Sequence, residues 1–201
     1  MEKKKVYCFD FDGTLTTSDT LLEFIKFAKG TARFFMVFLT YSPLLVLMKL
    51  HLYPNWKAKQ RIFAHLFAGM RIERFDKLCH EFAESHQHLL RPEGISCLHQ
   101  ALTDGARVFI VSASIDNWVS PFFQVRGLEK VEVLGTQIEV KDGKLTGRFQ
   151  TNNCYGEEKV RRIKEALSLP RSTYDIEAFG DSRGDKEMLA FADRGHYKPF
   201  R

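Results

Sequence analysis

Short apolar runs, each followed closely by a polar residue, recur along this chain. They cover Val6–Phe9, Val108–Val111 and Ile176–Phe179, and an acid or a serine follows each within two residues. The first two runs are uninterrupted, which is typical of strands buried on both faces of a parallel sheet. The pattern predicts an α/β protein whose polar residues gather where the strands end.

The segment from residue 18 to residue 90 follows a different pattern. Its apolar residues recur at helical spacing around residues 21–27, 57–68 and 72–90, so we expect amphipathic helices there. Arg91-Pro92 marks the return to the sheet, and a helix over Ile95–Leu102 leads to the second strand. This arrangement predicts a helical cap, residues 18–90, inserted into a core of residues 1–17 and 91–201.

Two later runs predict a β-hairpin. Val133–Val140 and Lys144–Phe149 are rich in β-branched residues and are joined by Asp142-Gly143. Asp-Gly between two such runs is typical of a two-residue hairpin turn.

Within the cap, residues 34–48 carry no charge, while basic residues flank them on both sides. The run is short for a bilayer span of about 20 residues, and Pro43 interrupts it. Three interpretations stay open: buried cap core or a dimer contact, an interfacial helix that touches membrane or a lipid tail, and a true span. We expect a helix with an exposed apolar face that includes Phe35, Phe38 and Leu45.

Composition narrows the class of protein. The 201 residues carry a net charge of +5 with a pI near 9.0, which suits anionic substrates or anionic lipid. No module of interleaved basic and aromatic residues supports nucleic-acid binding. The four cysteines lack Cys-x-x-Cys spacing, and the apolar run after Lys3-Lys4-Lys5 is broken at Asp10. We therefore expect reduced thiols, no secretory signal and a cytoplasmic protein, with association with a membrane left open.

The stretch Phe-Asp-Phe-Asp-Gly-Thr, residues 9–14, carries the first candidate chemistry. Strand residues two apart point the same way, so Asp10 and Asp12 would meet one site before Gly13 ends the strand. Two close like charges repel, and burial adds a desolvation cost. The pair suits a bound cation, or a nucleophile beside a proton donor; the alternative is a polar turn at Asp12-Gly13.

Three further segments offer matching groups. Ser112 follows the second strand and could bond a phosphate oxygen or cap a helix. Lys159 falls in the first turn of a helix, where the dipole disfavours a cation, so it would reach a nearby anion or be solvated. Asp181 ends the third strand, and Asp185 follows four residues later, where it could also be a plain N-cap.

Taken together, the four segments resemble the motifs of the haloacid dehalogenase superfamily of aspartate-nucleophile phosphohydrolases. Asp10 and Asp12 match the first motif, Ser112 the second, Lys159 the third, and Asp181 with Asp185 the fourth. The resemblance covers nearly the whole chain. It implies a Rossmann-like doubly wound parallel sheet with an inserted helical cap, similar to the phosphoserine phosphatase-like subgroup.

The resemblance also implies a mechanism. Asp10 would attack phosphorus and form an aspartyl-phosphate, while Asp12 would protonate the leaving group and then activate water. Ser112 and Lys159 would bind the phosphoryl group. Mg²⁺ would be held by the side chains of Asp10 and Asp181 and the backbone carbonyl of Asp12, with Asp185 in support.

Departures from the subgroup bear on the substrate. Phosphoserine phosphatases have Glu at the position of Asp19, Gly-Gly at Ala113-Ser114 and Asn at Gly184. These differences weaken phosphoserine as the substrate, whereas the apolar cap resembles that of bacterial phosphatidylglycerophosphate phosphatases. A phosphomonoesterase acting on a lipid phosphate or a small metabolite is favoured. The alternatives are a phosphoserine phosphatase, a phosphotransferase, and a non-enzymatic phosphate-binding or membrane-associated regulator.

Overall fold

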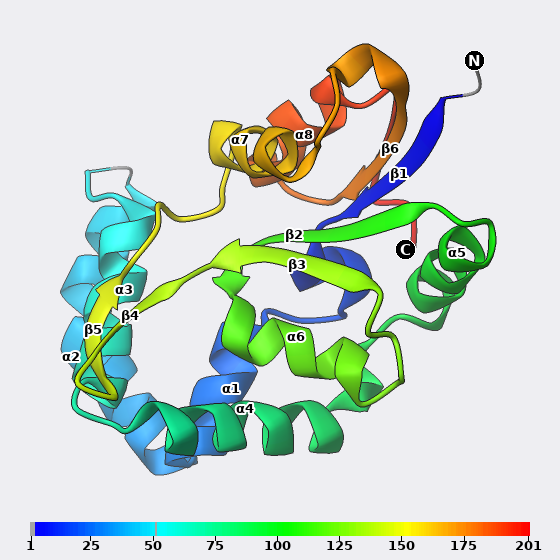
Figure 1. Ribbon diagram of the computed structural model, residues 1–201. Coiled ribbons are helices and arrows are strands. Elements are labelled where there is room, and N and C mark those ends of the chain that lie inside the picture. The colour runs from blue at the N-terminus through cyan, green and yellow to red at the C-terminus, as the bar shows by residue number, and fades with distance from the viewer. Residues whose placement is uncertain (1–2, 51) are drawn as a thin grey trace.

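The computed structural model describes residues 3–50 and 52–201. Its centre is a five-stranded, wholly parallel sheet in the order β3-β2-β1-β6-β7 (Figure 1). The strands are β1 Lys4–Phe9, β2 Arg107–Ile115, β3 Val131–Thr136, β6 Tyr174–Gly180 and β7 Arg194–Tyr197. The predicted α/β fold with a parallel sheet is confirmed.

Helices cover both faces of this sheet (Figure 1). Helices α5 (Pro92–Thr103) and α6 (Asp116–Gln124) lie on one face, and α7 (Glu157–Ala166) and α8 (Lys186–Phe191) on the other. Alternate residues along a strand point to opposite faces. Accordingly, Val108 and Ile110 of β2 join one hydrophobic cluster, and Phe109 and Val111 join the other.

Four helices between β1 and α5 form the inserted part. They are α1 Thr20–Lys29, α2 Thr31–Lys49, α3 Asn55–Phe67 and α4 Ile72–Ser85. Helical spacing located α1, α3 and α4, but α4 ends at Ser85, and a single 3₁₀ turn, Gln87–Leu89, follows it. The exact limits of the cap stay a prediction.

The chain enters and leaves the insertion along a paired stem. The Thr17 amide donates to the Leu89 carbonyl, and the Arg91 amide donates to the Leu15 carbonyl, both at 2.8 Å. Thr16 and Leu90 form an antiparallel bridge between these two bonds. The two segments that connect the helices to the sheet are therefore held side by side.

A two-stranded antiparallel hairpin, β4 Ile138–Lys141 and β5 Lys144–Phe149, packs against the insertion. Asp142 and Gly143 have φ angles of 50° and 70°, as the predicted hairpin turn requires. The predicted first strand, Val133–Val140, is wrong, because the chain leaves the main sheet after Thr136 and the hairpin begins at Ile138. A Cβ on Gly147 would lie 2.7 Å from the Ala64 Cβ, so β5 lies directly on α3.

Helix α2 contains the uncharged run and continues through Pro43. Proline cannot donate to the carbonyl of Leu39 four residues earlier. The Ser42 hydroxyl donates to that carbonyl instead, at 2.8 Å. The Leu39 carbonyl therefore still accepts a hydrogen bond. The expected interruption at Pro43 is therefore wrong.

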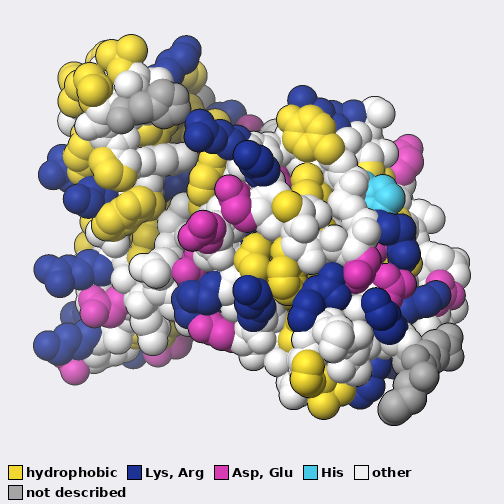
Figure 2. Space-filling model, turned by 90° about the horizontal axis from the view of Figure 1, so that it is seen from above, with side chains coloured by type: hydrophobic (Ala, Val, Ile, Leu, Met, Phe, Trp, Pro, Cys, Tyr) yellow, Lys and Arg dark blue, Asp and Glu magenta, His cyan; other side chains and the backbone are white. Residues whose placement is uncertain are grey.

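One side of α2 faces the protein and the other side is uncovered. Phe34 and Val37 are buried, and Phe38 and Leu45 pack partly against the core. The opposite side exposes large apolar groups: Phe35 64%, Met36 61%, Leu39 77% and Val46 56%. Hydrophobic side chains accordingly gather at the surface of this end of the molecule, with Lys and Arg nearby (Figure 2).

These exposures decide part of the question about the run. Buried cap core is wrong for this helix, since only 11% of its most apolar window is buried. By length and composition α2 is the one helix of the described chain that could cross a membrane. The exposed apolar face is confirmed and includes Phe35, but Phe38 and Leu45, which were expected on it, are partly buried against the core.

Candidate active site

Asp10 is the first residue after β1, at the centre of the sheet. Its amide donates to the Phe179 carbonyl at 2.9 Å, which fixes the backbone beside β6. β1 ends at Phe9, and residues 11–15 form a tight turn in which Gly13 has a φ of 80°. The two acids thus follow the strand instead of ending it, and the turn sets their directions.

Lys159 is buried beside Asp10. Its Nζ donates three hydrogen bonds of 2.6 Å, to Asp10 Oδ1, Asp185 Oδ1 and the Val111 carbonyl. A lysine so fully buried must be paired, and here two carboxylates share it. The structure therefore brings together the predicted residues of the first, third and fourth motifs and excludes a solvated Lys159.

The charged groups of this cluster shift one another's pKa values. Burial raises the pKa of Asp10 to about 7, although Lys159 works in the opposite direction. Burial disfavours the charge of Lys159, but the carboxylates of Asp10 and Asp185 outweigh it and raise the pKa of the ammonium. Asp185 is also desolvated, yet Lys159 and Ser182 lower the pKa of its carboxyl. The cluster therefore keeps Lys159 charged and leaves Asp10 without full compensation.

Asp185 turns towards the site although it stands at the first position before α8. Its Oδ2 accepts from the amides of Asp181 and Ser182 at 3.1 and 2.9 Å and from the Ser182 hydroxyl at 2.8 Å. It makes no capping bond to α8. The alternative that Asp185 only caps a helix is therefore wrong. Its carboxylate instead binds the backbone of the turn that carries Asp181.

Asp10, Asp181 and Asp185 could hold a metal ion together. One carboxylate oxygen from each lies within 4.8 Å of the other two. A set of carboxylate oxygens suits a hard cation such as Mg²⁺. The turn is shaped to this cluster, since a Cβ on Gly13 would lie 2.6 Å from Asp181 Oδ2. Asp181 also bonds Arg201, so a cation already faces this carboxylate.

The Asp12 carboxylate lies outside this cluster and faces the start of α1. Its Oδ1 accepts from the Thr20 amide at 2.7 Å and from the Thr20 hydroxyl at 2.6 Å. Its Oδ2 accepts from the Ser114 hydroxyl at 2.5 Å. Amides in the first turn of a helix lack partners within the helix and favour an anion. The indole of Trp118 donates to the Thr20 hydroxyl at 3.2 Å and so fixes this arrangement from behind.

Ser112 is almost fully buried at the end of the regular part of β2. Its hydroxyl oxygen accepts from the Ser114 amide at 3.0 Å, and the carbonyl of the preceding residue, Val111, accepts from Lys159. Ser112 therefore lies next to the acidic cluster. Its predicted contact with phosphate stays a prediction.

Sequence reasoning missed Thr20 and Ser114 as partners of Asp12, and Trp118 as a partner of Thr20. Ser114 is 102 positions away from Asp12, and nothing in the local pattern links the two. Only Thr20 carried a signal, because it follows Asp19, whose side chain caps α1 by accepting from the Leu21 amide at 3.0 Å.

Removing the Ser114 hydroxyl is expected to slow turnover without unfolding the protein. In Ser114→Ala, Asp12 keeps both bonds from Thr20 but loses the one that fixes Oδ2. A bond to a charged group is worth about 1.5–3 kcal/mol, so kcat should fall by about ten- to a hundredfold with little change in KM. Steady-state kinetics on an aryl phosphate would measure this.

The control is Ser85→Ala, whose hydroxyl bonds groups at the end of α4. Its kcat should stay within about twofold of the wild type. Equal kcat values in the two variants would contradict a role for Ser114 in positioning Asp12.

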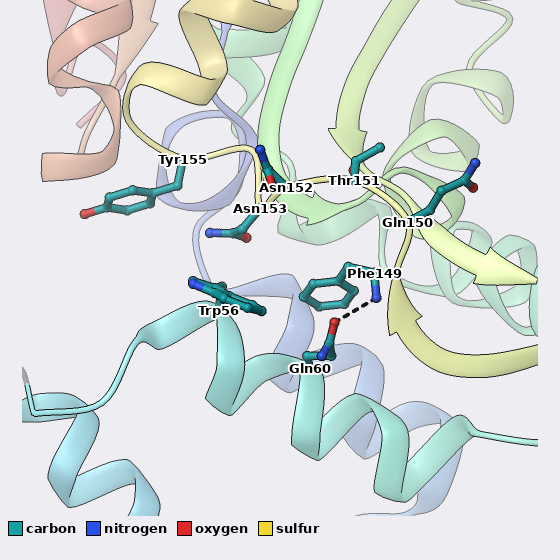
Figure 3. A pocket seen from close by; sticks show the side chains of 8 residues that line it. All are labelled: Trp56, Gln60, Phe149, Gln150, Thr151, Asn152, Asn153 and Tyr155. Carbon is teal, nitrogen blue, oxygen red and sulfur yellow. Dashed lines mark hydrogen bonds between the residues drawn. The ribbon is translucent and has the colours of Figure 1, made fainter.

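Next to the site, a cavity of about 470 Å³ opens between α3 and the loop before α7 (Figure 3). Trp56 and Gln60 line one side, and Phe149, Asn153 and Tyr155 line the other. Phe149 also lines a much smaller cavity with Lys59 and Ser114. The side of the hairpin and the inserted helices therefore offers room for a ligand beside the site.

Comparisons with known proteins agree with this geometry. Residues 8–190 match the family of haloacid dehalogenase-like hydrolases. Protein CicA of Caulobacter vibrioides is 35% identical over 198 residues, which are 96% of this chain and 85% of CicA.

Solved structures share the fold. A protein of unknown function from Bordetella pertussis Tohama I has a TM-score of 0.81 at 19% identity. The match covers 94% of this chain and 87% of the Bordetella chain. A phospho-aspartyl intermediate analogue of phosphoserine phosphatase has a TM-score of 0.56 at 24% identity. The match covers 95% of this chain and 84% of the phosphatase chain. These likenesses show the fold, and the family match extends over most of the sequence. The protein thus belongs to the haloacid dehalogenase-like hydrolase family.

Proposed function

We propose that the protein hydrolyses phosphomonoesters through an aspartyl-phosphate on Asp10, with Mg²⁺ as its cofactor. The observation that carries this proposal is the buried contact of Lys159 with both Asp10 and Asp185. Burying two carboxylates and one ammonium from three distant segments costs free energy. Clusters of this kind are concentrated at functional sites. An in-line attack on phosphorus uses each of these groups.

The chain's own residues divide the reaction between them. Asp10 Oδ attacks phosphorus, so that an O–P bond forms on Asp10 while the bond to the leaving alkoxide breaks. Asp12 donates a proton to that alkoxide and then takes one from the water that cleaves the aspartyl-phosphate. Lys159 and the Ser112 hydroxyl neutralise charge on the phosphoryl oxygens.

Asp10, Asp181 and the backbone of Asp12 would hold the metal ion, and Asp185 would support them. When bound, Mg²⁺ supplies positive charge next to the transferring phosphoryl group. Asp185 orders the turn of Asp181, as its bonds to the amides of Asp181 and Ser182 indicate.

Contacts particular to this chain argue against phosphoserine as the substrate. Ser114, where phosphoserine phosphatases have Gly, bonds Asp12 directly. Gly184, where they have Asn, leaves no room for a side chain, because a Cβ there would lie 2.4 Å from the Tyr155 ring. Tyr155 also lines the cavity beside the site, so these changes alter the space that a substrate would occupy.

Removing the metal is expected to abolish hydrolysis. With excess EDTA, release of phosphate from an aryl phosphate should fall below about a hundredth of the Mg²⁺ rate, because the clustered carboxylates would repel the phosphate. Added Mg²⁺ should restore the rate. Asp181→Ala should raise the half-saturating Mg²⁺ concentration by at least about tenfold.

The matched control is Asp193→Ala, whose carboxylate pairs with Arg171 away from the cluster. Full activity in EDTA would overturn the role of the metal. Tight phosphate binding without turnover would favour a non-enzymatic regulator, and transfer of phosphate to an added alcohol in place of water would favour a phosphotransferase.

A further inference from the structure

The uncovered side of α2 is the largest feature that hydrolysis leaves unexplained. Phe35, Met36, Leu39 and Val46 are each more than half exposed, and Leu50 and Leu52 continue the apolar surface past the helix at 60% and 72%. Single exposed apolar residues are common, but a contiguous apolar patch marks an interaction site. We call these six residues the α2 face.

The stretch of sequence that contains the α2 face carries charge of one sign only. Between Glu23 and Glu73 the sequence contains no Asp or Glu at all, and its Lys and Arg residues are Lys26, Lys29, Arg33, Lys49, Lys57, Lys59, Arg61 and Arg71. Within the described chain, Arg33, Lys49, Lys57 and Arg61 form no salt bridge. Their charge is therefore available to a partner, and that partner should be anionic.

We propose that the α2 face docks on the surface of an anionic membrane, with α2 lying in the interface rather than crossing the bilayer. An apolar strip bordered by lysine and arginine is the pattern of interfacial helices. The buried side of α2 favours lying over crossing, because Phe34 and Val37 are packed in the protein core and would have to be pulled out of it. A second protein copy would put the unpaired cations of both chains next to each other, which disfavours that occupant.

The neighbouring surface connects the α2 face with the active site. A cavity of about 580 Å³ lies at the end of α2, lined by Met48, Leu52 and Tyr53. It shares Trp56, Asn153 and Tyr155 with the 470 Å³ cavity of Figure 3, which in turn adjoins the small space at Ser114. Tyr and Trp prefer the level of lipid headgroups. Docking through the α2 face would thus place this row of cavities at the membrane surface.

This row also indicates a substrate class, and that part of the inference rests on the proposed function. A phosphomonoester on a lipid headgroup could reach Asp10 while its tails stay in the membrane. The aromatic and apolar lining near α2 suits the start of an acyl chain, and Lys59 faces the space beside Ser114.

Sedimentation with vesicles tests the docking without any need for turnover. The full chain should bind vesicles of phosphatidylglycerol and phosphatidylcholine at low salt, and vesicles of phosphatidylcholine alone at least about tenfold more weakly. Phe35→Ser, Leu39→Ser and Val46→Ser together should weaken binding by at least about a hundredfold. The matched control replaces Val125, Val140 and Leu169, which are exposed by 39–41% elsewhere, and should bind as the wild type does.

Charge reversal tests the electrostatic part. Lys49→Glu with Lys57→Glu should weaken binding to the anionic vesicles by at least about tenfold, because each nearby cation is worth roughly fivefold. Lys130→Glu with Lys164→Glu, of equal net charge, should have a smaller effect. Equal binding to neutral and anionic vesicles, or equal loss in both pairs, would overturn an anionic membrane as the partner.

Activity separates docking from the proposed function. The triple Ser variant should hydrolyse a soluble aryl phosphate at the wild-type rate but phosphatidic acid in vesicles at least about tenfold more slowly. No hydrolysis of either substrate by the wild type would overturn the proposed function and leave the sedimentation result standing. Failure of the wild type to sediment, or a dimer that the triple variant converts to monomer, would overturn the docking.

Discussion

Asp10→Asn is expected to remove phosphatase turnover by roughly four orders of magnitude or more. The amide that replaces the carboxylate is a poor nucleophile and a weak metal ligand, so the first covalent step has no substitute. Asn is close in size to Asp, and the backbone bond from residue 10 to Phe179 does not involve the side chain. The fold should therefore persist. Steady-state phosphate release measures the rate, and circular dichroism checks the fold.

Asp142→Asn is the matched control for this substitution. Asp142 lies in the exposed hairpin turn at a positive φ, which Asn adopts readily. Its activity should equal that of the wild type. If Asp10→Asn retained a tenth of the wild-type activity, Asp10 would not be the nucleophile.

Lys159→Met is expected to abolish turnover and also to destabilise the metal-free protein. The methionine fills similar volume, but Asp10 and Asp185 are left buried without the ammonium that bonds both at 2.6 Å. Breaking a buried ion pair in this way costs about 3–5 kcal/mol. Urea unfolding in metal-free buffer would measure the loss in the free energy of unfolding.

The loss caused by Lys159→Met should grow as the pH rises. Burial already raises the pKa of Asp10 to about 7, and removing the lysine, which lowers it, raises that pKa further. A carboxyl whose pKa is raised by folding stabilises the folded state below its unfolded pKa and loses that contribution as the pH rises through its folded pKa. The deficit should thus be larger at pH 8 than at pH 5.

Lys164→Met, at an exposed position on the same helix, should change the free energy of unfolding by no more than about 0.5 kcal/mol. A deficit of the same size at pH 5 and pH 8 would contradict the account of the buried cluster.

The sequence predicted most of the sheet because three of its strands are interior. β1, β2 and β6 are buried on both faces and so read as apolar runs that end in polar residues. β7 lies at the edge and reads Arg-Gly-His-Tyr, which gives no apolar signal, and no strand was expected there. The boundary between β3 and β4 was missed because Val133–Val140 is β-branched on both sides of Gln137.

The candidate site, too, has a part that the sequence predicts and a part that it does not. Asp10, Lys159, Asp181 and Asp185 converge because each stands at the end of a neighbouring strand or at the start of the helix that follows. For the three acids this convergence follows from parallel topology, whereas Lys159 reaches them from α7, which follows the hairpin β4–β5. The surroundings of Asp12 depend on how the insertion packs against α6, through contacts such as the Phe24 and Trp118 rings at 5.1 Å. Packing between distant segments leaves no periodic trace in a sequence.

The stem at the base of the insertion has a consequence for how such a chain can change through evolution. Because the bonds between Thr17 and Leu89 and between Leu15 and Arg91 hold its two ends together, the helices between them can be lengthened, shortened or exchanged without displacing β1, provided that the bonds of Thr20 to Asp12 are kept. The nucleophile is carried on the core side of this junction, whereas α2 and α3 are carried on the other side. Recombination at residues 16–18 and 89–91 could therefore exchange the whole insertion as one genetic segment. Each exchange could give the same hydrolytic core a different substrate.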